Sequence, residues 1–168
     1  MKILETERTI LREVIADDAE FVLDLLNQPS FIKYIGDRNV RTVDEARDYI
    51  ESRFASSYQK FNYGMWAVEL KESATLIGLC GFVRRDTLPD ADIGFAFLPQ
   101  FEKKGFAYES AAATMKYGQN VQKLPRVLAI TSKDNFSSQK LLDKIGLKFE
   151  RLISLSDDAE ELKLFSNG

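Results

Sequence analysis

The chain of 168 residues has no histidine and only one cysteine. Without histidine it has no Ser-His-Asp triad, no histidine general base and no histidine-ligated metal. A single cysteine excludes an intrachain disulfide and a zinc–cysteine cluster. Cys80 lies in the apolar segment 76–83. Because no histidine base accompanies it, we expect a buried, unreactive thiol that packs as a small apolar side chain.

Long apolar runs and an excess of one charge are also missing. Residues 1–8 contain no apolar core of signal-peptide length, and no window of the sequence approaches a membrane span. We therefore expect a soluble protein of the cytoplasm, with no membrane partner. The 23 basic and 26 acidic residues give a net charge of −3, without a block of like charge. Because non-specific nucleic-acid binding needs a basic surface, no direct nucleic-acid partner is expected.

The apolar residues, 45% of the chain, are enough for a substantial core. No repeat, linker or break in composition divides the sequence, so residues 1–168 are predicted to form one domain. Periodicity and turn signals predict the order β-α-α-β-β-β-α-β-α-β-β, a mixed α/β fold with helices on both faces of a sheet. Pro29 is expected to end the first helix, before an irregular aromatic segment. The strands are expected at residues 9–14, 64–70, 76–85, 92–98, 126–131, 147–155 and 161–166, and the helices at 17–27, 42–54, 106–119 and 135–145.

Residues 92–110 are the most informative segment of the chain. They combine an apolar strand, a short basic turn with one glycine, and a helix that opens with small residues. Such a turn aims unpaired backbone N–H groups at one place, where the helix dipole favours phosphate. Gly105 permits close approach of the backbone, and Lys103 and Lys104 add positive charge. The segment predicts a phosphorylated ligand beside the carboxylate of Asp92, although an ordinary strand–helix connection has the same pattern. A Walker loop is excluded because Gly-Lys-Ser/Thr is missing.

Three motifs and the order of elements make the chain resemble the GNAT-type N-acetyltransferases over nearly its whole length. The resemblance is closest to the branch of ribosomal-protein N-terminal-alanine acetyltransferases, which shares the opening Thr-Glu-Arg-Thr-Ile-Leu-Arg and the later Gly-Leu-Cys-Gly-Phe and Asp-Ile-Gly-Phe. The family's acetyl-CoA loop reads Gln/Arg-x-x-Gly-x-Gly/Ala. Residues 102–107 read Glu-Lys-Lys-Gly-Phe-Ala, which matches at Gly105 and Ala107 and departs at Glu102. Lys103 stands where the family often has a second glycine.

The resemblance implies acetyl-CoA as co-substrate, no metal, and a mostly antiparallel, twisted sheet of about seven strands with about four helices. In relatives the sheet splays where the pantetheine arm enters it, here between the strands 92–98 and 126–131. The arm would pair with main-chain groups of the first of these strands, which also offers an N–H as oxyanion donor. We expect that contact from Phe95, Ala96, Phe97 and Leu98. The pyrophosphate would lie against the main-chain N–H groups of Lys103, Lys104, Gly105, Phe106 and Ala107.

The second motif, residues 135–147, resembles the family's Asn-x-x-Ser-x-x-Leu-Leu-x-Lys-x-Gly-Phe helix. In relatives the asparagine meets the pantetheine arm, so Asn135 is expected to bind the cofactor; a helix N-cap is the alternative, and one side chain can do both. Many relatives carry a tyrosine general acid where this chain has Leu142. Ser138 matches the motif's serine, and its hydroxyl is a candidate for protonating the leaving thiolate. The alternative for Ser138 is a solvated helix residue.

Asp92 is the third element of the resemblance, because relatives usually carry a glutamate there, and it is the candidate catalytic base. Amine acetylation needs a deprotonated nitrogen, which is easier for an N-terminal amine, with a pKa of about 8, than for a lysine, at about 10.4. Because aspartate is one methylene shorter than glutamate, we expect the proton to pass through a water. The alternative for Asp92 is an ordinary surface charge, and Asp90 is a weaker substitute.

These features favour an N-acetyltransferase that moves an acetyl group from acetyl-CoA directly to a primary amine, in a ternary complex. The acceptor is expected to be a protein N-terminus or a small-molecule amine. A direct transfer fits a chain without an activated nucleophile. The alternatives are a non-catalytic acyl-CoA-binding or regulatory module and an α/β protein for another anion. The chain is expected to be a monomer or a homodimer.

The loops around residues 29–41, 61–66 and 86–91 are expected to recognise the acceptor. Five aromatic side chains in or near these loops either line its pocket or belong to the core: Phe31, Tyr34, Tyr63, Trp66 and Phe82.

Overall fold

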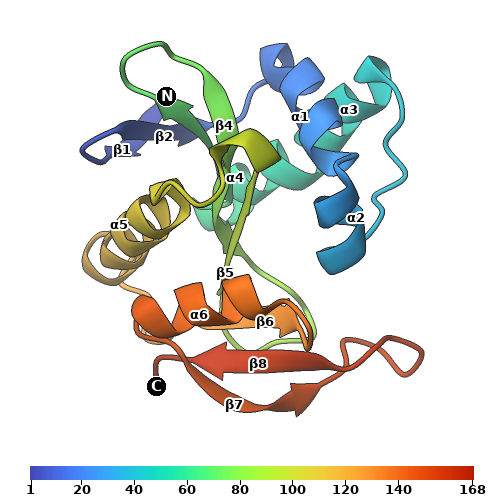
Figure 1. The fold of residues 1–168 in the computed structure, drawn as a ribbon, viewed down its shortest axis with the longest axis vertical. Helices are drawn as coiled ribbons and strands as arrows, with labels where there is room; N and C mark the ends of the chain where they lie inside the picture. The colour runs from blue at the N-terminus through green and yellow to red at the C-terminus, as the bar shows by residue number, and fades with distance from the viewer.

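One continuous sheet of eight strands organises the computed structural model, which describes residues 1–168 (Figure 1). The strands lie in the order β1-β2-β3-β4-β5-β6-β8-β7, and every neighbouring pair is antiparallel except β5–β6, which is parallel. The predicted mixed α/β fold with a mostly antiparallel sheet is therefore confirmed. The bounds are Lys2–Glu5 (β1), Thr9–Glu13 (β2), Met65–Leu70 (β3), Leu76–Val83 (β4), Asp92–Phe97 (β5), Leu128–Ser132 (β6), Lys148–Ile153 (β7) and Leu162–Ser166 (β8).

The edge strand β1 is missing from the strands predicted by sequence. It has four residues, all exposed or half-buried, and it pairs only with β2. A strand that short, at an edge, carries little of the alternation by which half-buried strands are recognised. The strand β4 also ends before its predicted end at Arg85, because Arg84 and Arg85 leave the ladder.

Three helical segments follow one another without a break: α3 (Val43–Tyr49), a π-helical stretch (Ile50–Ala55) and α4 (Ser56–Phe61). We call them together the long helix. Thr42 caps it as predicted, with its Oγ1 accepting a hydrogen bond from the N–H of Glu45 at 3.1 Å. The long helix continues past its predicted end. Short π-helical stretches within helices occur frequently at functional sites.

The remaining α-helices are α1 (Ala19–Leu26), α2 (Pro29–Tyr34), α5 (Phe106–Asn120) and α6 (Phe136–Lys144). None of them, nor the long helix, has the length and apolar character of a membrane-spanning segment. The helix α2 lies where the sequence predicts an irregular segment. Proline is well tolerated at the first position of a helix, where its missing N–H would have no partner. The proline therefore starts α2 as well as closing α1.

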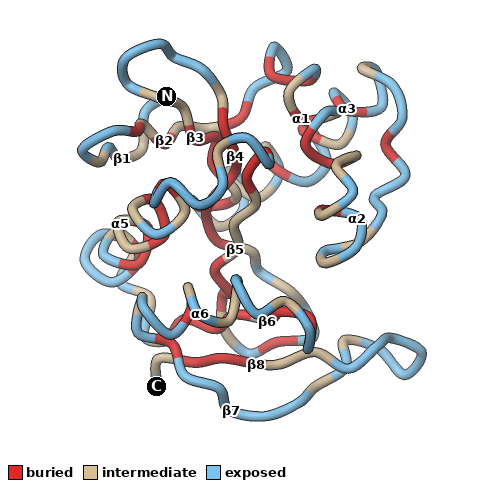
Figure 2. Tube along the Cα trace, viewed as in Figure 1, coloured by how far each residue is buried: buried red, intermediate tan, exposed pale blue.

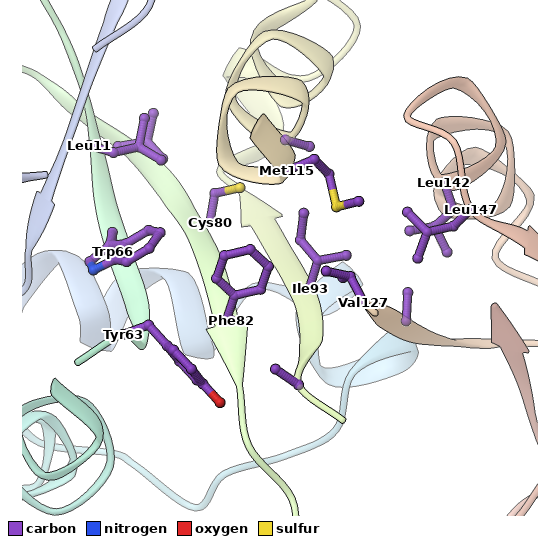
Figure 3. Close-up of a cluster of buried hydrophobic side chains, with 14 of the residues drawn as sticks. Leu11, Tyr63, Trp66, Cys80, Phe82, Ile93, Met115, Val127, Leu142 and Leu147 are labelled. Carbon is purple, nitrogen blue, oxygen red and sulfur yellow. The ribbon is translucent and has the colours of Figure 1, made fainter. Parts of the chain in front are cut away.

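The central strands of the sheet are buried on both faces, whereas the edge strands β1 and β7 are largely exposed (Figures 1 and 2). On one side α5 and α6 pack against the strands around Trp66, Phe82 and Met115 (Figure 3). On the other side α1, α2 and α3 pack around Val22. Each large apolar side chain that is fully buried contributes about 1.5–3 kcal/mol. Cys80 is fully buried on the α5 side, as expected, and burial raises its pKa to about 12, which disfavours the reactive thiolate.

The strands β5 and β6 separate as soon as they have met. Asp92 and Leu128 form the only residue pair between them, whereas β4 pairs with β5 along the whole of β5. The parallel strands diverge from this pair toward their C-terminal ends. This is the splay that the family resemblance implies, and it leaves one edge of β5 without a neighbouring strand at the centre of the sheet.

Candidate active site

The splay between β5 and β6 opens into two adjoining cavities. The larger one, which we call the Asp92 cavity, has a volume of about 570 Å³ and reaches Asp92. The smaller one, which we call the loop cavity, has a volume of about 340 Å³ and is lined by part of the 102–107 segment. Because several residues line both, the two cavities form one elongated site. The shared residues are Phe31, Tyr34, Ile35, Phe95, Ala96, Asn135 and Ser138.

The central strand β5 lines both cavities. Phe95 and Ala96 border both cavities, and Phe97 borders the loop cavity. Leu98, the fourth residue expected to contact the pantetheine arm, borders neither. It follows the end of β5 and packs among the buried residues beside α1 and α3.

The loop before α5 has the backbone geometry of an anion cradle. Lys103 (φ 60°) and Gly105 (φ 85°) both adopt the left-handed conformation, which explains why the family favours a glycine at each of the two positions. The main-chain N–H groups of residues 103–107 have no acceptor within the chain. Together with the N-terminal end of a 15-residue helix, these free donors favour a phosphate.

The side chains of this loop are not all on the cavity side. Glu102, Lys103, Gly105 and Ala107 border the loop cavity. Lys104 does not, and its carbonyl oxygen accepts a hydrogen bond from Arg8 at 3.1 Å. The Phe106 ring belongs to the core on the α5 side, so only its main-chain N–H remains for a ligand.

The turn between β1 and β2 is hydrogen-bonded to the start of α5. The Arg8 Nε donates to Glu109 Oε1 at 2.8 Å, and the Arg8 main-chain N–H donates to Oε2 at 2.9 Å. The guanidinium also lies 4.1 Å from the centre of the Phe106 ring. Burial alone would raise the pKa of Glu109, but hydrogen bonds from Thr6 and Arg8 outweigh it and lower that pKa. Thr6 and Arg8 belong to the opening segment that this chain shares with the family, but the sequence analysis assigned them no role.

Asp92 lies where the splay begins, with its side chain only 2% exposed. Burial raises its pKa to about 6, against the opposing charge of Arg85, whose Nε lies 3.1 Å from Oδ1. The structure thus places Asp92 in the cavity wall rather than on the surface. Asp90 pairs with Arg126 at 2.9 Å and borders neither cavity.

Asn135 and Ser138 meet at the start of α6, on the border of both cavities. The Asn135 Oδ1 accepts a hydrogen bond from the N–H of Ser138 at 3.3 Å, so Asn135 is the N-cap of the helix. Leu142 borders the Asp92 cavity but is almost fully buried.

Two polar features of the site were not found from the sequence. The Oγ1 of Thr131, on β6, is buried in the wall of the Asp92 cavity without a hydrogen-bond partner. A buried polar atom of this kind normally has a partner, so a ligand or a water would satisfy it. The Oγ of Ser132 donates to the carbonyl oxygen of Tyr34 at 2.9 Å, which ties β6 to α2 across the site.

Three of the five candidate aromatic residues border the Asp92 cavity, namely Phe31, Tyr34 and Phe82. Tyr63 and Trp66 do not, and both belong to the core on the α5 side (Figure 3). Besides Arg85, which pairs with Asp92, four basic side chains that the sequence analysis did not single out border the same cavity: Arg38, Arg53, Lys60 and Arg84. Only the spacing of Arg53 and Lys60 along one helix could have been noticed in the sequence.

Comparisons with known proteins agree with this geometry. The family described as "Acetyltransferase (GNAT) domain" matches residues 8–148. The uncharacterized N-acetyltransferase YoaA of Bacillus subtilis (strain 168) is 32% identical over 152 residues, which cover 90% of this chain and 85% of that protein.

Two solved structures are similar along almost the whole chain. One, an acetyltransferase (GNAT family) from Bacillus anthracis, has a TM-score of 0.80 at 26% identity and covers 99% of this chain and 97% of its own. The other is RimL, a ribosomal L7/L12 alpha-N-protein acetyltransferase in complex with coenzyme A. It has a TM-score of 0.85 at 15% identity, and the match covers 99% of this chain and 97% of RimL. The predicted family is confirmed: this chain is an acyltransferase enzyme that belongs to the GNAT family of N-acetyltransferases.

Proposed function

We propose that residues 1–168 form a single catalytic domain that transfers an acetyl group from acetyl-CoA directly to a primary amine. One observation supports this most strongly. The free N–H groups of residues 103–107 and the buried carboxyl of Asp92 lie along one elongated site, at the splay of the sheet. Overall, an ammonium and a thioester give an amide, a thiol and a proton; an N–C bond forms and the C–S bond breaks.

The residues of the site fit coenzyme A. The N–H groups of residues 103–107 are placed to hold the pyrophosphate, with Lys103 beside them. The free edge of β5 and the Thr131 hydroxyl offer partners to the pantetheine arm. When bound, acetyl-CoA supplies the acetyl group as an activated thioester. A main-chain N–H of β5 then donates to the carbonyl oxygen as negative charge develops there.

Asp92 accepts the proton of the acceptor ammonium, through a water, because its side chain lies within the cavity wall. Its pKa of about 6 suits this role better than the ordinary value of 3.8. The raised value brings the pKa of Asp92 closer to that of an N-terminal amine by about two pKa units. This makes the proton transfer from the amine easier by on the order of 3 kcal/mol. Above pH 6 the carboxyl is mostly ionised and ready to accept.

Ser138 is our candidate for protonating the leaving thiolate, and its position on the border of both cavities supports this role. Asn135 caps α6 and faces the same junction, so it serves the pantetheine arm and the helix together. A protein N-terminus is one acceptor that this site fits, and RimL, which shares the fold, is named as an acetyltransferase of a ribosomal protein N-terminus. A small-molecule amine is the other.

The base assignment is tested with Asp92→Asn at saturating acceptor, from about pH 5 to 9, so that the profile spans the Asp92 pKa. Removing a general base is expected to lower kcat by about 100-fold or more, and to remove the rise in rate with pH that reflects the Asp92 pKa. Calorimetric titration with CoA shows whether the variant still binds. An unchanged kcat across this range would show that Asp92 is not the base. CoA binding by the wild type without turnover of any amine would favour the non-catalytic module instead.

A further inference from the structure

Four basic side chains border the Asp92 cavity without an acidic partner. Arg38, Arg53, Lys60 and Arg84 take part in none of the ion pairs of the chain. The cavity has only two acidic side chains, and one of these, Asp92, is paired with Arg85. This concentration of unpaired cations occurs in a chain whose net charge is −3. We call these four residues the cationic rim.

The cationic rim comes from three separate segments. Arg38 follows α2, Arg53 and Lys60 lie on the long helix, and Arg84 follows β4. The Nη1 of Arg84 is held by the carbonyl oxygen of Leu88 at 2.7 Å, which leaves the charge of Arg84 uncompensated. Convergence of cations from three segments on one cavity focuses positive potential inside it.

The side of the long helix that borders the cavity carries no acidic residue. Its polar residues on the cavity side are basic or carry a hydroxyl, and none is acidic: Tyr49, Ser52, Arg53, Ser56, Ser57 and Lys60. The acidic residues of the same helix, which include Asp48 and Glu51, do not border the cavity. Guanidinium, ammonium and hydroxyl groups are the usual partners of carboxylate and phosphate.

The cationic rim is separate from the part of the site that fits the phosphates of CoA. None of its four residues borders the loop cavity, and neither Lys103 nor Glu102 borders the Asp92 cavity. Between the two groups lie the residues that both cavities share. The rim therefore faces whatever enters the cavity from the side opposite the cofactor loop.

We propose that the acceptor is an anionic amine: its amino group reaches toward Asp92 while a carboxylate or phosphate elsewhere in the same molecule binds the cationic rim. This inference rests on the proposed function and specifies the substrate class of that site. A peptide with acidic residues after its N-terminus and a small amino acid or amino phosphate share this chemistry. Electrostatic complementarity of this kind sets the choice of partner and speeds its encounter.

The experiment compares matched acceptors in acetylation assays. Peptides that begin with alanine followed by two aspartates, two asparagines or two lysines form one set, and phosphoethanolamine with ethanolamine forms the other. We expect kcat/KM to be about tenfold higher for the anionic member, because two or three exposed ion pairs add up to about one factor of ten. The peptide set and the small-molecule set identify which source of the anion is used. In about 1 M salt, where the screening length is about 3 Å, the preference should shrink.

The double variant Arg53→Gln/Lys60→Gln is expected to lose most of this preference. Lys116→Gln, on the exposed side of α5 and outside both cavities, is the matched control and should keep it. Equal kcat/KM for acidic and neutral acceptors, with acetylation intact, would overturn the inference and leave the proposed function standing.

Turnover of no amine at all would instead contradict the proposed function. In that case calorimetric titration of the acidic and neutral peptides into the CoA-loaded protein decides the inference separately. Tighter binding of the acidic peptide, lost in the double variant, supports the cationic rim as an anion site, and equal binding overturns it.

Discussion

Asp92 is held in a position that favours its protonated form. Its pKa is about 6 in the folded chain because burial disfavours the charge more than Arg85 compensates it, and the ordinary value is 3.8. A carboxyl whose pKa is raised by folding stabilises the folded state fully below its unfolded value. That stabilisation is lost as the pH rises through the folded value, here from about 4 to about 6. The ionised base needed for catalysis is therefore obtained at the expense of stability.

The variant Asp92→Asn cannot ionise, so it should escape this loss. Relative to the wild type, its free energy of unfolding is expected to rise between about pH 4 and pH 7 by on the order of 3 kcal/mol. Urea denaturation at several pH values measures the difference. Asp157→Asn, in the exposed turn between β7 and β8, serves as control. A difference that does not change with pH would contradict the proposed burial effect.

At the scale of elements, the start of α5 depends on a turn about a hundred residues earlier in the chain. Arg8 contacts Glu109, Lys104 and Phe106, and none of these four residues borders the Asp92 cavity or the loop cavity. Arg8 therefore acts as a positioning residue for the cofactor loop. It supports the peptide between Lys104 and Gly105, where the backbone turns through a positive φ.

Replacing Arg8 by alanine should loosen this loop while the core stays intact. Because Arg8 supplies a charged hydrogen-bonding group, we expect the Kd for CoA and the KM for acetyl-CoA to rise about tenfold. The KM for the acceptor should stay near the wild-type value. Arg8→Lys keeps the charge and should recover part of the affinity, and Arg151→Ala on exposed β7 should have no effect. Equal losses for both substrates, or a lowered melting temperature with unchanged CoA binding, would argue for a purely structural role.

At the scale of the whole molecule, the site exists because one parallel pair interrupts an antiparallel sheet. The splay leaves a gap in the middle of the sheet, and the hydrogen bond from Ser132 to Tyr34 links β6 to α2 across it. Residues of β5, α2, α5 and α6 all border the loop cavity, so a ligand that fills it would contact these four elements together. Binding should therefore stabilise the whole fold rather than one element.

Coenzyme A at about 100 times its Kd is expected to add about 2.7 kcal/mol to the free energy of unfolding. For a chain of this size that corresponds to a rise in Tm of about 5–10 °C. Pantetheine, which lacks the phosphates, should produce a much smaller rise at the same concentration, because it leaves the N–H groups of residues 103–107 unpaired. Differential scanning calorimetry measures both. An equal shift with pantetheine would mean that the loop contributes little to binding.

Local patterns in the sequence were enough to predict much of the structure of this protein. The Thr42 cap, the glycine at position 105, the strand–turn–helix segment and the order of elements depend on neighbours a few residues away, so they are readable without the fold. Short elements were missed, because four residues in β1 and six in α2 carry little periodicity. These local features also carried the resemblance to the GNAT family, and that resemblance in turn implied the splay.

Other properties were decided only by tertiary structure, because they arise between residues that are far apart in the sequence. The raised pKa of Asp92 comes from the burial that surrounding elements impose. The hydrogen bonds between Arg8 and Glu109 join residues separated by about a hundred positions. The cationic rim needs three segments to meet at one cavity. The sequence by itself thus determined the fold class, the family and the loop that suits a phosphate. The folded chain decided which charges face the acceptor, because charge and burial act through space rather than along the chain.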